Sequence, residues 1–221
     1  MLRGQLFTNY VLRQENYTPM KDYIVAQDLK ECAREKYSRN EFLVKGVPRI
    51  FLYESNFDGE NTNDLIVSCH EACHFLNNQK DVGAVKRLKF FEKLYKATFL
   101  FALLPGIVWA CLYLLGNSSS LHIFLAIIVI IFGITGTCLF TLSYRKDEIS
   151  TEILAKEMVE KHLDSAFKFY GDNRTYLQLK DEINNIFNER MNKDIKEATV
   201  TRGIWGVFLV VINLFLFFNW I

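Results

Sequence analysis

Three residues in the first half of the chain have the types and the spacing of a metal-dependent hydrolase. His70, Glu71 and His74 form the pattern H-E-x-x-H. On a helix, residues four positions apart lie on one face, so both imidazoles can reach one zinc ion. A bound zinc ion polarises a water molecule, and Glu71 is placed to take its proton. The pattern predicts a zinc site with Glu71 as the catalytic base; the alternative is two histidines that bind no metal.

Two carboxylates much later in the chain could complete this site. A hydrolytic zinc site needs three protein ligands and an open position for water. Glu148 and Glu152 are one helical turn apart, in a segment with helical apolar spacing over 146–170. Glu148 is the predicted third ligand, and Glu152 could accept a hydrogen bond from a ligand imidazole and so fix its tautomer. The alternative is that both carboxylates only solvate a helix beside Arg145 and Lys146.

The H-E-x-x-H residues are expected on a helix over 63–79. Asn61 or Asn63 can cap its first turn. Apolar residues spread over much of its circumference, which indicates a mostly buried helix. Cys69 and Cys73 lie on the same helix and point about 100° away from the histidines. We interpret them as small core residues rather than as thiolate ligands.

The chain before this helix predicts a small region of mixed structure. Residues 1–17 show no clear period, whereas 19–37 follows a helix-start signal and has helical apolar spacing. Residues 41–45 and 49–53 have the composition of strands. They are expected to form a small sheet, and an exposed edge of that sheet could instead hold an extended peptide by strand addition.

Long charge-free runs dominate the rest of the sequence. Three of them are long enough to cross a bilayer as helices: 97–115, 121–144 and 203–221. The first two predict a transmembrane hairpin, which would return the chain to the side it left and bring Glu148 back toward His70. We therefore expect an α-helical integral membrane protein with a small α+β part. Four segments are predicted: a mixed part over 1–96, a transmembrane hairpin over 97–144, a helical part over 145–202 and a final span over 203–221. The helical part contains predicted helices over 146–170 and 172–202.

The charge pattern adds a location to this prediction. The formal net charge is only +1, so no global basic field indicates a nucleic-acid partner. Lys and Arg gather at one end of the apolar runs, including a basic amphipathic stretch over 80–96. This places the polar segments in the cytoplasm and the chain in a cell membrane as a multi-pass protein, with the lipid bilayer as a partner.

Five cysteines, an odd number, suggest no disulfide framework. His162 is expected on a helix surface, outside the site.

The order of H-E-x-x-H, a hairpin and R-x-x-E-x-x-x-E resembles the integral-membrane peptidases of the gluzincin type. In their HtpX-like branch the second motif reads R-x-x-E-x-x-A-D. Arg145 and Glu148 match it, while Thr151 and Glu152 stand where Ala and Asp are usual. The layout is closer to the YugP-like neutral zinc metallopeptidases of bacterial membranes, although the N-terminal span common in that family is missing. Cys73 also replaces the usual Gly of H-E-x-G-H.

This resemblance implies a gluzincin-like fold with one zinc ion per chain. It implies His70, His74 and Glu148 as ligands and Glu71 as the base, in agreement with the residue-level reasoning. The expected function is a membrane-embedded zinc endopeptidase of the cytoplasmic face, acting on peptides or membrane proteins. An alternative, motivated by Cys73, is a non-catalytic adaptor that keeps the metal and binds a partner protein. A purely structural three-span protein is a further alternative.

The purified chain is expected to carry about one zinc ion, because two imidazoles and a carboxylate form a complete catalytic ligand set. Elemental analysis of protein purified without added metal measures this ratio. Zinc-free protein with an intact H-E-x-x-H segment would contradict the prediction.

Overall fold

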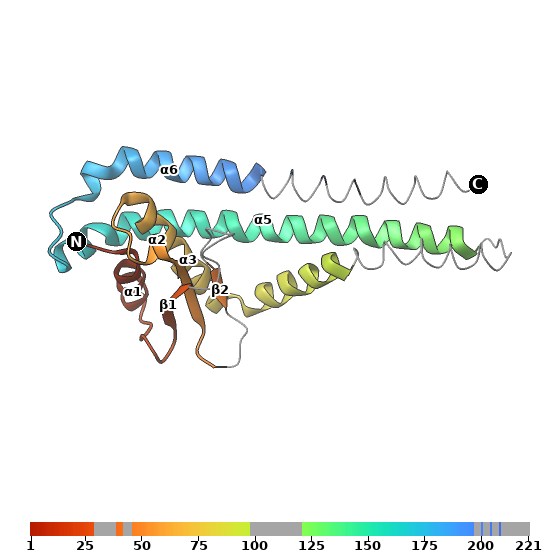
Figure 1. Cartoon of the computed structure of the whole chain (residues 1–221), viewed down its shortest axis with the longest axis horizontal. Helices are drawn as coiled ribbons and strands as arrows, with labels where there is room; N and C mark the ends of the chain where they lie inside the picture. The colour runs from red at the N-terminus through yellow and green to blue at the C-terminus, as the bar shows by residue number, and fades with distance from the viewer. Residues whose placement is uncertain are drawn as a thin grey trace. The chain divides into compact units, whose positions relative to one another are not determined.

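The structure is a computed structural model that describes residues 1–28, 39–41, 46–97 and 121–196, together with residues 200, 204 and 208 (Figure 1). The chain divides into two compact units. The first comprises Met1–Val82 and Glu148–Asn192, and the second comprises Gly83–Asp147 and Lys193–Ile221. The candidate ligands all belong to the first unit.

The first unit begins with helix α1, Gly4–Gln14. Its buried residues are Gly4, Phe7, Thr8, Val11 and Leu12. The Thr8 hydroxyl donates a hydrogen bond to the Ser68 carbonyl at 2.9 Å. Sequence reasoning found no period here, because a polar residue occupies the centre of the buried face and interrupts the apolar pattern.

The predicted helix over 19–37 is wrong in its first half. Pro19 forms an isolated bridge with Tyr23, and strand β1 follows over Ile24–Asp28. Met20 has a φ of 66°, which no right-handed helix contains. The Asp22 carboxylate accepts a hydrogen bond from the Thr18 N–H at 2.7 Å and holds this turn. Pairing of β1 with a distant strand therefore overrides the local helical spacing, and the remainder, 29–38, lies outside the described residues.

Three strands form the sheet, in the order β1-β3-β2. β3, Arg49–Tyr53, is central; it pairs in parallel with β1 and antiparallel with β2, Arg39–Glu41. Ile50 and Leu52 of β3 are fully buried, while Phe51 and Tyr53 are partly exposed. The prediction of a strand over 49–53 is confirmed. Of the strand predicted over 41–45, residues 42–45 fall outside the described part.

A short helix α2, Glu54–Phe57, leads to α3, Thr62–Lys80, which confirms the helix predicted over 63–79. The Asn61 side chain accepts a hydrogen bond from the Asp64 N–H at 2.8 Å, so Asn61 is the N-cap. α3 contributes buried side chains to two apolar clusters. One cluster joins it to α1 and to later helices, and the other joins it to the sheet. Two-sided burial makes α3 a rigid platform for its polar side chains.

Two long helices follow: α5, Leu121–Phe169, and α6, Tyr176–Lys196. The helix predicted over 146–170 is the second half of α5, since no glycine or proline interrupts the chain near Tyr144. The segment of α5 in the first unit and α6 lie side by side and antiparallel (Figure 1). Tyr176 contacts Glu160 at 3.3 Å, and Arg190 contacts Glu152 at 2.7 Å.

The predicted class of integral membrane protein requires correction. A helix crosses a bilayer only when about 20 consecutive residues are mostly apolar, and no helix in the described part of the chain is long and apolar enough. This finding overturns the transmembrane hairpin, the multi-pass membrane location and the cytoplasmic placement that depended on it. Of the predicted spans, 121–144 is part of α5, which continues without a break into a charged segment. Nearly all of 97–115 and 203–221 lies outside the described residues.

The second unit contains the helical residues 83–97 and the first half of α5. The Tyr95 and Phe140 rings stack at 5.2 Å between centroids. The basic stretch predicted over 80–96 is therefore helical in most of its length. Its Tyr95 packs within this unit, whereas Phe90 is exposed.

Gly4 permits close packing of α1 on the rest of the first unit, and this can be tested. A Cβ at this position would collide with the Asn56 carbonyl and the Ser68 hydroxyl. Gly4→Ala should lower the free energy of unfolding by about 1–3 kcal/mol through overpacking, measured by urea denaturation. Gln14→Ala, at the exposed end of the same helix, is the control and should change stability little. Equal stability of both variants would contradict the packing described.

Candidate metal centre

The candidate site lies where α3 faces the second half of α5. His70 and His74 are one turn apart on α3, and their rings meet edge to face with centroids 4.6 Å apart. The His70 side chain is 6% exposed and that of His74 is 14% exposed. Both imidazoles are therefore largely shielded from solvent.

Glu148 on α5 reaches both imidazoles with one oxygen. Its Oε2 lies 3.5 Å from the Nε2 of His70 and 3.5 Å from the Nε2 of His74. One ligand atom from each of the three residues falls within 4.8 Å of the others. Ligands about 2.0–2.1 Å from a tetrahedral zinc ion are about 3.4 Å apart, so these separations fit a metal. His70, His74 and Glu148 together could hold a metal ion.

Glu152 occupies the position predicted for a supporting carboxylate. Its Oε1 lies 3.2 Å from the Nδ1 of His70, and its side chain is 1% exposed. The contact is close but not aligned as a hydrogen bond, so His70 Nδ1 and Glu152 Oε2 are buried without a hydrogen-bond partner among the described atoms. Arg190 of α6 donates from Nε to Glu152 Oε1 at 2.7 Å and balances the buried charge. A proton on Nδ1, facing this carboxylate, leaves Nε2 of His70 free to bind a cation.

A second support holds His74. Its Nδ1 lies 3.2 Å from the Thr151 hydroxyl oxygen, which also accepts a hydrogen bond from Asn77 Nδ2 at 3.1 Å. The hydroxyl can either donate its proton to Nδ1 or accept the proton of Nδ1–H. Only the second arrangement leaves Nε2 of His74 unprotonated, as metal binding requires. With Asn77 fixing the oxygen, Thr151 is placed to select that tautomer.

One turn of α5 thus supplies the third ligand and both supports. Glu148, Thr151 and Glu152 are spaced at i, i+3 and i+4, which places them on one face of the helix. Both imidazoles direct Nε2 toward Glu148 and Nδ1 toward a separate residue of the same turn. The four contacts are mutually compatible, so the rings are held on both sides.

The charges of this centre favour a cation. Burial raises the pKa of Glu148, but the imidazoles of His74 and His70 outweigh it, and the pKa of Glu148 lies well below its ordinary value. Burial lowers the pKa of His70, but its contacts with Glu148 and Glu152 outweigh this and raise it. The Glu152 pKa is lowered as well, since His70 and Arg190 together overcome the effect of its burial. Two ionised carboxylates therefore surround a buried pair of imidazoles.

Glu71, the predicted base, lies on α3 and is 6% exposed. Burial raises its pKa, and the charges of His74 and His70 oppose that rise. A carboxylate whose pKa is raised is a better proton acceptor than an ordinary one, as a general base requires. The influence of both imidazoles places Glu71 within electrostatic range of the candidate ligands.

The two cysteines of α3 pack in the core, as predicted. Cys69 and Cys73 are fully buried, and the Cys69 thiol contacts the Ala155 carbonyl of α5 at 3.8 Å. Burial raises the pKa of Cys73 well above its ordinary value, so the thiol stays protonated. Neither cysteine belongs to the group of potential metal ligands found in the described residues. Cys73 therefore fills space between α3 and α5.

Sequence reasoning missed three supporting residues. Thr151 had a local signal, because it shares a helix face with Glu148 and Glu152. Asn77 lies one turn after His74 on α3, but an amide at that spacing is common on helix surfaces. Arg190 had no signal, since only the packing of α6 on α5 brings it to the site. His162, expected on a surface, is 6% exposed and faces Glu15 across 3.4 Å, so it is a buried core residue outside the site.

Comparison with protein-family models, with curated proteins and with solved structures gives no match for this chain. The family resemblance drawn from the two motifs therefore stays a prediction. The site geometry described above is the basis for a proposed function.

The role of Thr151 can be measured through metal affinity. Thr151→Val keeps the shape of the side chain and removes the oxygen that faces His74 Nδ1. Loss of such a supporting contact typically weakens metal binding about 10–100-fold. Zinc affinity, determined by competition with a chromophoric chelator, should fall by this factor, whereas Thr151→Ser should bind zinc as the unmodified chain does.

Glu148→Ala provides the comparison for loss of a ligand itself and should weaken zinc binding more than Thr151→Val. Zinc affinity that is unchanged in Thr151→Val would show that the hydroxyl does not position His74.

Proposed function

We propose that this chain is a zinc-dependent endopeptidase that hydrolyses peptide bonds with a metal-activated water molecule. The observation that carries the proposal is the convergence of His70, His74 and Glu148 beside the buried carboxylate of Glu71. Metal ligands alone would support storage or structure. Ligands next to a base of raised pKa are typical of hydrolytic centres.

Zinc is the metal that this donor set favours. Two imidazole nitrogens and one carboxylate oxygen suit zinc better than calcium or magnesium, which prefer oxygen ligands only. Structural zinc sites usually have four protein ligands, and catalytic sites have three with one position for water. The described residues supply three, so the site supports catalysis rather than a purely structural role.

The residues of the chain have separate tasks in this reaction. When bound, a zinc ion lowers the pKa of a water molecule and polarises a substrate carbonyl. Glu71 takes the proton of the attacking water and delivers it to the leaving amine. Glu152 and Thr151 hold the two imidazoles in the tautomer that leaves Nε2 available. Arg190 neutralises Glu152, so that a buried carboxylate can serve this purpose without an uncompensated charge.

A non-catalytic metal-binding protein is the competing function. The alternative of a non-catalytic protein was suggested by Cys73, which stands where the H-E-x-G-H motif has glycine. Cys73 is fully buried in the core between α3 and α5. Its thiol therefore does not block the imidazoles or Glu71. The ligand set and the base are both retained, which favours hydrolysis over a purely binding role.

Glu71→Gln separates the two functions. The amide cannot accept a proton but keeps the size of the carboxylate, so zinc content should be unchanged. General acid–base catalysis contributes about 10²–10⁴-fold, and turnover of an unfolded casein-type substrate should fall by at least this factor. Fluorescence release from the labelled substrate measures the rate.

Glu157→Gln is the matched control, because Glu157 is an exposed carboxylate of the same unit. It should retain full turnover. A Glu71→Gln variant as active as the unmodified chain would contradict the mechanism. Zinc binding without turnover in any form of the chain would instead favour the non-catalytic function.

A further inference from the structure

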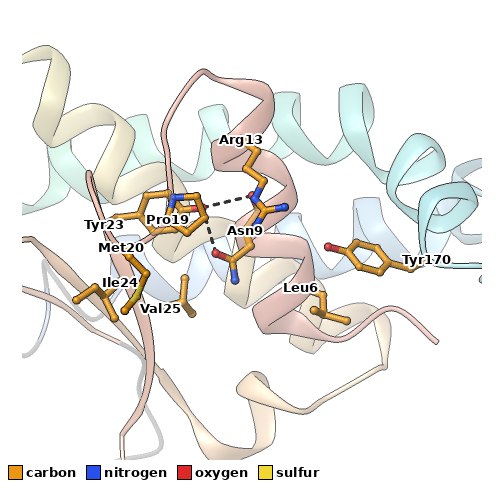
Figure 2. A pocket seen from close by; sticks show the side chains of 9 residues that line it. All are labelled: Leu6, Asn9, Arg13, Pro19, Met20, Tyr23, Ile24, Val25 and Tyr170. Carbon is orange, nitrogen blue, oxygen red and sulfur yellow. Dashed lines mark hydrogen bonds between the residues drawn. The ribbon is translucent and has the colours of Figure 1, made fainter.

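A cavity of the first unit lies between α1 and the start of β1 (Figure 2). Its volume is about 250 Å³. This is small for a cofactor and suits a group about the size of one amino-acid residue. Its walls come from one face of α1, the turn before β1, the first residues of β1 and the chain just after α5: Leu6, Asn9, Arg13, Pro19, Met20, Tyr23, Ile24, Val25 and Tyr170.

Some polar groups of this cavity are already engaged with one another. The Tyr23 hydroxyl donates to Asn9 Oδ1 at 3.1 Å (Figure 2). Asn9 Nδ2 donates to the Gln5 carbonyl at 2.8 Å. Tyr23 is fully buried behind the cavity. These groups form a fixed polar wall and do not define a ligand by themselves.

Arg13 supplies the charge of the cavity. It is the only charged residue among those that line it, and no carboxylate pairs with it in the described part of the chain. The nearest acidic residues in sequence have other partners: Glu15 pairs with Lys161, and Asp22 accepts from the Thr18 N–H. The guanidinium lies between Tyr23 and Tyr170 (Figure 2). Burial raises the pKa of Tyr23 to about 12, and the Arg13 charge opposes that rise.

The donors that face the cavity therefore suit an anion. A guanidinium carries five N–H groups in a planar fork that matches a carboxylate. The hydroxyl of Tyr170 points toward the same space (Figure 2). The opposite side is apolar, with Leu6, Ile24 and Val25 as its wall and the exposed Met20 at its rim. A ligand would combine a carboxylate with an apolar group.

The position of the cavity at an edge strand indicates how such a ligand would continue. β1 forms one edge of the sheet, so far as the described strands go. The Ile24 N–H donates to the Pro48 carbonyl at 2.9 Å, toward β3. Backbone groups alternate along a strand, so those of Val25 point to the outer edge. An extended peptide could pair with this edge while its last residue enters the cavity.

We propose that this cavity binds the C-terminal carboxylate of an extended peptide whose last side chain is apolar. Arg13 and Tyr170 hold the carboxylate, Leu6 and Ile24 contact the side chain, and Val25 pairs with the peptide backbone. The cavity is separate from the metal centre. The two sites have no residue in common, although Tyr23 of the cavity packs on Phe75, the residue after His74, with ring centroids 5.8 Å apart. The binding assigned to the cavity uses none of the residues that carry the proposed peptidase activity.

Fluorescence anisotropy with a short labelled peptide ending in leucine tests the assignment. The full-length Glu71→Gln chain is used as the parent protein, so that any hydrolysis does not consume the probe. The free-acid peptide should bind at least about tenfold more tightly than the same peptide with a C-terminal amide. Arg13→Gln should remove this preference, and Arg13→Lys should restore only part of it, since lysine lacks the fork.

Lys21→Gln is the matched control, because Lys21 is an exposed cation close to the cavity but not in its lining. It should keep the preference for the free acid. Circular dichroism checks that each variant is folded, which is expected because Arg13 is exposed. Equal binding of the acid and the amide by the parent protein would overturn the proposal, as would a preference that survives in Arg13→Gln.

A further arm distinguishes a peptide from a free organic acid. N-acetyl-leucine has the carboxylate and the apolar side chain but no backbone to pair with Val25. It should compete much more weakly than the peptide, and methylation of the penultimate amide nitrogen should weaken the peptide. Competition by N-acetyl-leucine at the same concentration as the peptide would overturn the assignment to a peptide C terminus.

Discussion

Burial of four ionisable side chains between α3 and α5 is the constraint on which the rest of the structure depends. An unpaired charge in a protein interior costs several kcal/mol, so each buried group needs a partner of suitable sign and geometry. His70 and His74 meet this need through Glu148, and Glu152 meets it through His70 and Arg190. The apolar clusters on both sides of α3 hold the two helices at the separation that these contacts require. Packing and electrostatics at this interface therefore depend on each other.

Much of the candidate site could be predicted because its information is local. The spacing of His70 and His74 needs only a helix, and the helix over Thr62–Lys80 has a clear cap and a buried face. Glu148 was identified by chemistry, since a hydrolytic metal site needs a third ligand, and the structure places it beside both imidazoles. The strand over Arg49–Tyr53 was also predicted, because β-branched and aromatic residues are enriched in strands and Gly46 and Pro48 precede the run.

The errors share a physical cause, which is that distant partners override local pattern. Residues of β1 had helical spacing but pair with β3, and α1 was hidden because Thr8 satisfies its hydroxyl against α3 inside the core. Apolar runs were interpreted as membrane spans from composition and length alone, and no described helix supports that interpretation. Arg190 illustrates the same limit, because a surface-like arginine acquires its role only when α6 packs against Glu152.

The placement of Glu148, Thr151 and Glu152 on one turn of α5 has a consequence for how the centre can change. Successive residues of a helix are offset by about 100°, so a register shift of α5 by a single residue would remove all three side chains from the imidazoles together. No intermediate position keeps the ligand while losing the supports. A change in the phase of this helix would therefore move the third ligand and both supports away from the imidazoles at the same time.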